Sequence, residues 1–213
     1  YAFDTHIHAD HVSGLRELAA ETGARRLLSA GAIARGVTFD VETLTDGDEL
    51  TVGQSTVAVR ALPGHTTGMI GLTVGDVVLS GDSLFLDSVA RPDLEDETSV
   101  DRLAGLLYAS LTEGLSDLPD ETLLAPGHYD AGDEAASDGS YTAALGDVRR
   151  RVPVYGTDES TFVERATAEL PPQPANATQI VAINLGRASV TEDEVSVLER
   201  GPNNCAVDPA SGR

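Results

Sequence analysis

Three histidines and one carboxylate are packed into a short stretch near the start of the chain. Residues 5–11 read Thr-His-Ile-His-Ala-Asp-His. His6 and His8 alternate, so both side chains project to the same side of an extended segment. Asp10 and His11 follow where the chain turns toward a helix. This spacing can supply ligands to two adjacent metal positions.

The other candidate ligands share one context, in which a short apolar strand ends in a glycine turn. The three turns carry Gly64-His65, Gly81-Asp82 and Gly127-His128. Glycine allows the tight backbone that points the following side chain off the end of a strand. Loops at strand ends are where metal-binding and catalytic groups converge on a rigid scaffold.

Histidine placement favours a metal site over scattered structural histidines. A lone histidine is more often a surface or hydrogen-bonded core residue, but all five histidines of this chain fall in such segments. Imidazole and carboxylate groups suit Zn²⁺, Fe²⁺ or Mn²⁺. We therefore predict a metal site built from His6, His8, Asp10, His11, His65, Asp82 and His128.

Hydrophobic periodicity and turn signals predict the elements that position these residues. Strands are expected over residues 1–5, 27–29, 69–74, 77–79 and 122–125, with a strand, a turn and a strand between 41 and 62. Helices are expected over 15–22, 101–118 and 160–170, with a short one after 191 that ends at Gly201-Pro202. Segment 178–185 is apolar and open in type. The mixture predicts the α/β class.

The ligand-type motifs, taken in chain order, resemble the metallo-β-lactamase superfamily over about residues 1–130. The resemblance implies an αββα sandwich with the metal at the sheet edges. Residues 1–150 are expected to form its metal-binding core, and 151–213 a C-terminal helical extension of the same domain. That fold has strands before its first histidine motif, and this sequence has almost none. We therefore expect an N-terminally truncated fragment or a preceding domain.

Two groups of this superfamily carry the same seven residues. Glyoxalase II hydrolyses glutathione thioesters with two metals, whereas persulfide dioxygenases oxidise a thiol persulfide to sulfite with one iron. Arg91-Pro92-Asp93 and the segments 171–176 and 183–186 are similar to the dioxygenase group. The basic residues of the glyoxalase II substrate domain are not found. We predict a mononuclear non-haem iron persulfide dioxygenase, with a zinc glyoxalase II-like thioester hydrolase as the alternative, and a non-catalytic binding module as the least favoured class.

The resemblance assigns Fe(II) to His6, His65 and Asp82, which leaves positions open for O₂ and substrate. The remaining four residues of the set would orient these ligands. In the hydrolase alternative they complete a second zinc site, and a bound hydroxide attacks the thioester.

Asp10 and Arg91 are the candidate catalytic residues. Two roles are equally favoured for the Arg91 side chain. It holds the substrate or packs in the wall of the site, or it forms an ion pair with Asp93 or Glu95. The expected substrate is a small-molecule thiol persulfide or thioester. A fused or partner rhodanese domain and a homodimer are open expectations.

The charge balance limits the other partners. There are 35 acidic against 14 basic residues, for a net charge of −21. Such a field repels nucleic acid and anionic lipid, so neither is expected as a partner. Because the acidic residues are dispersed, we interpret them as solvation in the cytoplasm of a halophile; an acidic docking patch is the alternative. No membrane span or signal peptide is found. The single Cys205 is interpreted as a structural or incidental thiol.

Overall fold

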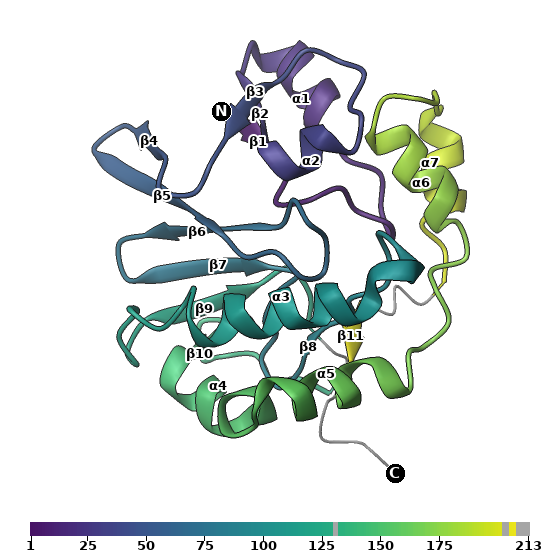
Figure 1. Cartoon of the computed structure of the whole chain (residues 1–213). Helices are drawn as coiled ribbons and strands as arrows, with labels where there is room; N and C mark the ends of the chain where they lie inside the picture. The colour runs from purple at the N-terminus through teal and green to yellow at the C-terminus, as the bar shows by residue number, and fades with distance from the viewer. Residues whose placement is uncertain (130–131, 202–204, 208–213) are drawn as a thin grey trace.

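A six-stranded sheet forms the centre of the fold, in the order β10-β9-β7-β6-β5-β4 (Figure 1). The computed structural model describes residues 1–213 except 130–131, 202–204 and 208–213. The strands are β4 (Glu49–Val52), β5 (Ser55–Ala61), β6 (Ile70–Val74), β7 (Val77–Gly81), β9 (Leu123–Pro126) and β10 (Ala143–Ala144). Gly75, with φ of 58°, turns β6 into β7 and confirms the hairpin that the sequence predicted there.

A smaller parallel sheet packs on one face of the large sheet. It contains β1 (Ala2–Phe3), β2 (Arg26–Ser29) and β3 (Glu42–Leu44). Buried apolar side chains of both sheets meet in one cluster, made of Leu27, Leu44, Leu50, Val59, Ile70 and Leu72. Helices α1 (Leu15–Thr22) and α2 (Ala30–Ala34) pack against the small sheet.

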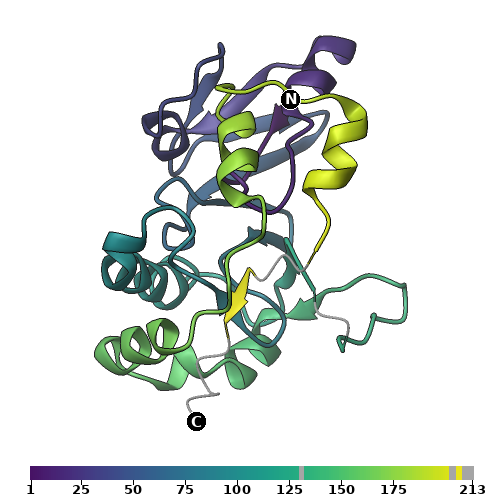
Figure 2. The ribbon, with the colours of Figure 1, turned by 90° about the vertical axis from the view of Figure 1, so that its right-hand side faces the viewer.

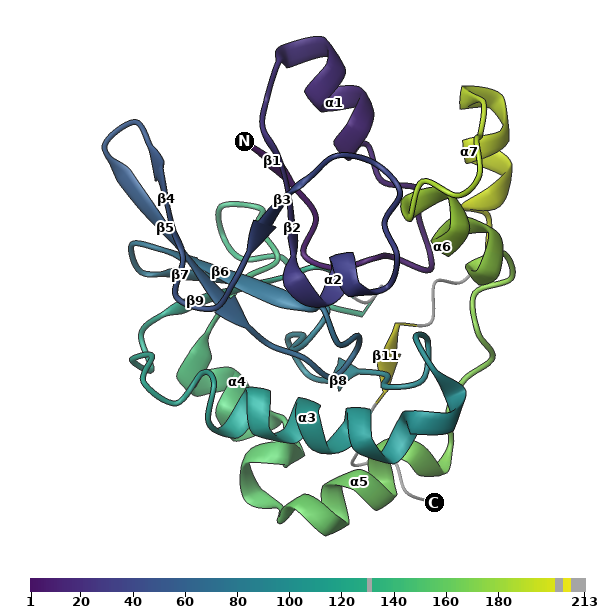
Figure 3. The same ribbon diagram turned by 45° about the horizontal axis from the view of Figure 1, so that its top comes forward.

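Helices cover the opposite face of the large sheet. They are α3 (Val100–Thr112), α4 (Leu145–Arg151) and α5 (Glu159–Ala168), with single 3₁₀ turns at Glu97–Ser99 and Pro153–Gly156. Leu107 and Phe162 from these helices share one buried core with Val78 and Leu124 from the sheet. The layers therefore run helix, sheet, sheet, helix, which confirms the α/β class and the αββα order (Figure 3).

The last part of the chain returns along one side of the sandwich. Figure 2 shows the connection from α5 running up that side to α6 (Ala177–Asn184), with α7 (Glu192–Leu198) beyond it. Strand β11 (Ala206–Val207) pairs antiparallel with β8 (Val89–Ala90). α5 lies after residue 150 and packs in the main core. The predicted boundary at residue 150, between the metal-binding core and the C-terminal extension, stays a prediction. No helix of the described residues has the length and apolar character needed to cross a membrane.

The structure corrects some predicted elements. The helix expected to reach residue 118 ends at Thr112. The reason is local, because Gly114 is a weak helix former and its N–H bonds the Ala109 carbonyl 3.1 Å away, as in a helix C-cap. Residues 42–44 pair with β2 in the small sheet, so the predicted turn at 45–48 links two sheets. The open segment 178–185 is helical, and Pro202 lies outside the described residues.

Candidate metal centre

Three strands of the large sheet bring three candidate ligands to one edge. β7 and β9 are parallel neighbours, and both β5 and β7 run antiparallel to β6. The C-terminal ends of β5, β7 and β9 therefore lie at the same edge, followed by His65, Asp82 and His128. The segment after β1 supplies His6, and the Thr5 carbonyl accepts a 2.9 Å hydrogen bond from the Ile70 amide.

Two positions at this edge require glycine because neighbouring side chains leave no room for a Cβ atom. Gly81 has φ of 51°, and a Cβ there would collide with the Met69 side chain. A Cβ on Gly127 would collide with Asp82 Oδ1. The glycine-then-ligand pattern noticed in the sequence therefore reflects space that the site itself needs.

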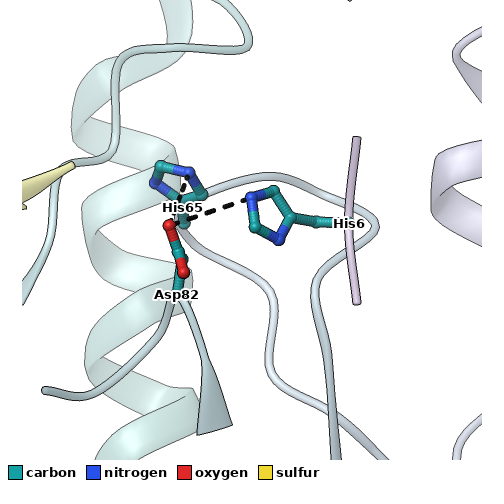
Figure 4. Close-up of side chains that lie close together, drawn as sticks. All are labelled: His6, His65 and Asp82. Atoms are coloured by element: carbon teal, nitrogen blue, oxygen red, sulfur yellow. Dashed lines mark ion pairs between the residues drawn. The ribbon is translucent and has the colours of Figure 1, made fainter. Parts of the chain in front are cut away.

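His6, His65 and Asp82 come together as a buried triad. Their side chains are at most 2% exposed. Asp82 Oδ2 lies 3.9 Å from His6 Nε2 and 3.9 Å from His65 Nε2. Figure 4 shows both rings beside the same carboxylate. Two ligand atoms that each lie about 2.0–2.2 Å from one ion are separated by about 3–4 Å, so this spacing fits a shared metal ion.

The polar atoms of the triad support the same fit. Among the described residues, His6 Nε2 and Asp82 Oδ2 are buried without a hydrogen-bond partner. Burial, then the neighbouring His8 and His65, hold the pKa of His6 well below its ordinary value. Burial also raises the pKa of Asp82. A neutral imidazole is the form that binds metal, and a buried carboxylate oxygen that accepts no hydrogen bond is costly unless a cation compensates it.

A second group lies beside the triad and contains the other predicted ligands. Ligand atoms of His8, Asp10 and His11 all lie within 4.8 Å of one another. His128 Nε2 is 3.2 Å from Asp82 Oδ2 and 3.5 Å from Asp10 Oδ2, so it stands between the two groups. The structure thus brings all seven predicted residues to one place, as two adjoining sets.

The second group is electrostatically different from the triad. Burial, then His11, lowers the pKa of His8 to about 3. Burial opposes ionisation of Asp10, but its hydrogen bond with His11 and nearby imidazoles lower its pKa to about 2. For His11, burial is outweighed by Asp10, which raises the pKa. Asp10 and His11 can therefore form an ion pair, with 3.3 Å between Oδ1 and Nδ1.

The backbone of Arg91 orients one triad ligand. His65 Nδ1–H donates a 2.8 Å hydrogen bond to the Arg91 carbonyl, which leaves Nε2 to face Asp82. A hydrogen bond of this kind fixes the tautomer and ring direction of a metal-binding histidine.

Asn184 on α6 holds the first histidine motif in shape and was not predicted as a site residue. Its side-chain amide donates to the carbonyls of His8 and His11 at 3.1 and 2.9 Å, and its Oδ1 accepts from the Ser13 amide at 2.8 Å. In the sequence it stands in segment 183–186, which is similar to the dioxygenase group, but that similarity assigned it no role.

The Arg91 side chain adopts the ion-pair alternative. It is 1% exposed, and its Nε and Nη2 donate to the two carboxylate oxygens of Asp93 at 2.7 and 2.8 Å. Its guanidinium also donates to the carbonyls of Pro171 and Pro172 at 2.6 and 3.0 Å. These contacts give Arg91 a positioning role, and its role as a substrate-holding residue remains a hypothesis.

Cys205, interpreted from the sequence as a structural or incidental thiol, lies beside the candidate centre. Its sulfur, a carboxylate oxygen of Asp10 and a ring nitrogen of His128 lie within 4.8 Å of one another. Burial, then Asp10 and Asp82, raise the pKa of this thiol. The pairing of β11 with β8 brings Cys205 to this place. No local sequence pattern predicts that long-range pairing.

Residues 2–128 match the Metallo-beta-lactamase superfamily, and the chain belongs to that superfamily. Among its relatives is a hydroxyacylglutathione hydrolase of Cereibacter sphaeroides, 38% identical over 143 residues that cover 66% of this chain and 51% of the relative. The human persulfide dioxygenase ETHE1 is 33% identical over 135 residues, covering 60% and 48%. The crystal structure of ETHE1 from Myxococcus xanthus has a TM-score of 0.74 at 32% identity, covering 87% of this chain and 76% of that one.

The chain spans about half the length of these curated relatives, at 51% and 48%. Members of the superfamily are metal-dependent enzymes, and relatives of both the hydrolase and the dioxygenase kinds are present. Sequence identity does not separate the two activities.

Proposed function

We propose that this protein is a mononuclear non-haem iron dioxygenase that oxidises a low-molecular-weight thiol persulfide to sulfite. The observation that carries the proposal is the buried set of two imidazoles and one carboxylate at His6, His65 and Asp82. Such a set suits Fe(II) with open positions. Similarity to the M. xanthus ETHE1 structure over most of the chain supports it.

The overall reaction is RSSH + O₂ + H₂O → RSH + H₂SO₃. When held by His6, His65 and Asp82, Fe(II) supplies open coordination positions and the redox chemistry that activates O₂. The Arg91 carbonyl keeps His65 Nε2 directed at the centre through the bond at Nδ1. Asp10, whose pKa is lowered to about 2, is ionised at neutral pH and holds the His11 ring through an ion pair of 3.3 Å.

A zinc-dependent thioester hydrolase is the second candidate. It is favoured by the second group, because His8, Asp10 and His11 also form a set able to hold an ion. His128, whose Nε2 lies 3.2 Å from Asp82 Oδ2, would join the residues that hold the two zinc ions. The similarity to a hydroxyacylglutathione hydrolase supports this alternative.

Paired assays test the two candidates. The protein is loaded separately with Fe(II) and Zn²⁺, and its metal content is measured before each assay. We expect the iron form to consume O₂ and release sulfite in equal amounts when a thiol persulfide is added, with no thioester hydrolysis by the zinc form. The opposite result would favour the hydrolase over the dioxygenase. In that result the iron form consumes no O₂ with any persulfide and the zinc form cleaves thioesters.

A further inference from the structure

A small pocket opens beside the candidate centre. His128 forms part of its wall, together with Phe85, Asp87, Ser88, Tyr129 and Asp133. His128 Nε2 lies 3.2 Å from Asp82 Oδ2, so the pocket adjoins the proposed reaction site. A substrate whose sulfur reaches the metal centre can therefore place another of its groups here.

Two aromatic rings shape the pocket. Phe85 is 3% exposed, and its ring centroid lies 6.0 Å from that of His128, nearly edge-on at 69°. Tyr129 is 57% exposed and stacks on Tyr141 with centroids 3.6 Å apart. The stacking holds the Tyr129 ring in place at the mouth. Ring faces attract organic cations, and more strongly where water is partly excluded.

The pocket has polar groups that can bind a cation, namely two carboxylates and one hydroxyl. Asp87 is exposed and Asp133 half-buried, so each can present a carboxylate without the full cost of burial. Ser88 is 7% exposed, and its Oγ is buried without a hydrogen-bond partner among the described residues. A serine hydroxyl can donate or accept, so this buried oxygen is able to accept a hydrogen bond from a ligand group.

We propose that this pocket binds the primary ammonium group of the thiol substrate. The inference rests on the proposed function and specifies its substrate class, which is a persulfide of an amine-bearing thiol. An ammonium group has donors for the two carboxylates and for Ser88 Oγ, and a charge suited to the ring of Tyr129. A thiol with a carboxylate at the same position meets like charges from Asp87 and Asp133.

Three persulfides that share the same two-carbon stem and differ in charge test the proposal. They are made from cysteamine, N-acetylcysteamine and 3-mercaptopropionate, and assayed in the lowest salt in which the protein stays folded. We expect kcat/KM to fall by about tenfold from the cationic to the neutral persulfide, and further for the anionic one. Asp87→Asn and Asp133→Asn should each reduce the ratio of kcat/KM for the cationic persulfide to that for the neutral one by about threefold.

A matched control separates the pocket from the general field of the molecule. A net charge of −21 attracts any cation, and Asp76→Asn removes one of these charges in the exposed turn at the far end of β7. This control should keep the wild-type preference. An equal loss of preference in Asp76→Asn and the pocket variants would overturn the proposal, as would a wild-type preference for the neutral or anionic persulfide.

Binding of the product thiols gives a readout that does not depend on turnover. Calorimetry with cysteamine, N-acetylcysteamine and 3-mercaptopropionate should show the same order of affinity, weakened by Ser88→Ala for cysteamine alone. If iron-holding protein turns over none of the persulfides, the proposed function is wrong. The order of the three thiol affinities still tests whether the pocket binds an ammonium group. Equal affinity for all three thiols would reject the ammonium site even if persulfides are oxidised.

Discussion

At the scale of single residues, Asp82 is the member of the candidate centre that both neighbouring sets share. Its Oδ2 lies within 3.9 Å of His6, His65 and His128 ring nitrogens. We predict that Asp82→Ala lowers iron affinity at least about 100-fold, because a directly bound ligand matters at least as much as the residues that orient it. Metal content per chain, measured after gel filtration, checks this.

Asp76→Ala is the matched control for that variant, since it removes an exposed carboxylate at the other end of the same strand. It should keep the wild-type metal content. Because Asp82 is buried, circular dichroism must show that the Asp82 variant is folded. A folded Asp82→Ala protein with full metal occupancy would refute the site assignment.

His8 provides a pH-dependent prediction for the metal-free protein. Its pKa is lowered to about 3 by burial and His11, against an ordinary value of 6.5. Above pH 6.5 the folded and unfolded states both hold it neutral. Below that pH the unfolded chain takes up a proton that the folded state resists, so stability falls as the pH falls toward 3. The slope contribution is at most about 1.4 kcal/mol per pH unit.

Urea unfolding of metal-free wild type and His8→Gln at several pH values between 6.5 and 4.5 measures this slope. The variant should lose less stability on acidification than the wild type, while other titrating groups cancel in the comparison. Parallel pH profiles for the two proteins would show that His8 is protonated equally easily in both states.

At the scale of elements, Arg91 connects segments that are distant in sequence. Its amide donates to the Cys205 carbonyl at 2.9 Å, its carbonyl accepts from His65, and its guanidinium reaches Asp93 and Pro171. Removing one member of a buried ion pair typically costs about 3–5 kcal/mol, because the other charge is left buried. We predict a loss of that size for Arg91→Ala, measured by urea unfolding.

The double variant Arg91→Met, Asp93→Leu removes both charges of the pair. It should be more stable than Arg91→Ala, because no buried charge is left without its partner. If the single and double variants unfold at the same urea concentration, then the ion pair is not the source of the loss.

Local sequence signals predicted the elements whose ends are set by neighbouring residues. The predicted bounds of α1, 15–22, are confirmed, and Gly23 with φ of 72° ends the helix. α7 follows residue 191 as predicted, and Thr191 and Glu194 form a capping box at its start. The first ligand segment was recognised from its closely spaced histidines, and the other three because each follows a strand and a glycine. By contrast, the site contacts of Cys205 and Asn184 depend on pairings across the whole chain, which no local pattern encodes.

At the scale of the whole molecule, the net charge of −21 governs how stability responds to salt. Repulsion among carboxylates destabilises the compact state, and at 1 M salt the screening length is only about 3 Å. If the charge is a halophilic adaptation, we predict that the melting temperature rises by about 5 °C or more from 0.1 to 2 M KCl, which corresponds to about 2 kcal/mol. Thermal unfolding followed by circular dichroism tests this, and highest stability in dilute buffer would contradict it.

Anomalous diffraction at the iron edge from crystals of the iron-loaded protein tests the central claim most directly. The account predicts a single strong peak within about 2.3 Å of His6 Nε2, His65 Nε2 and Asp82 Oδ2. A peak among His8, Asp10 and His11, or two peaks of equal strength on either side of Asp82, would contradict a mononuclear iron centre.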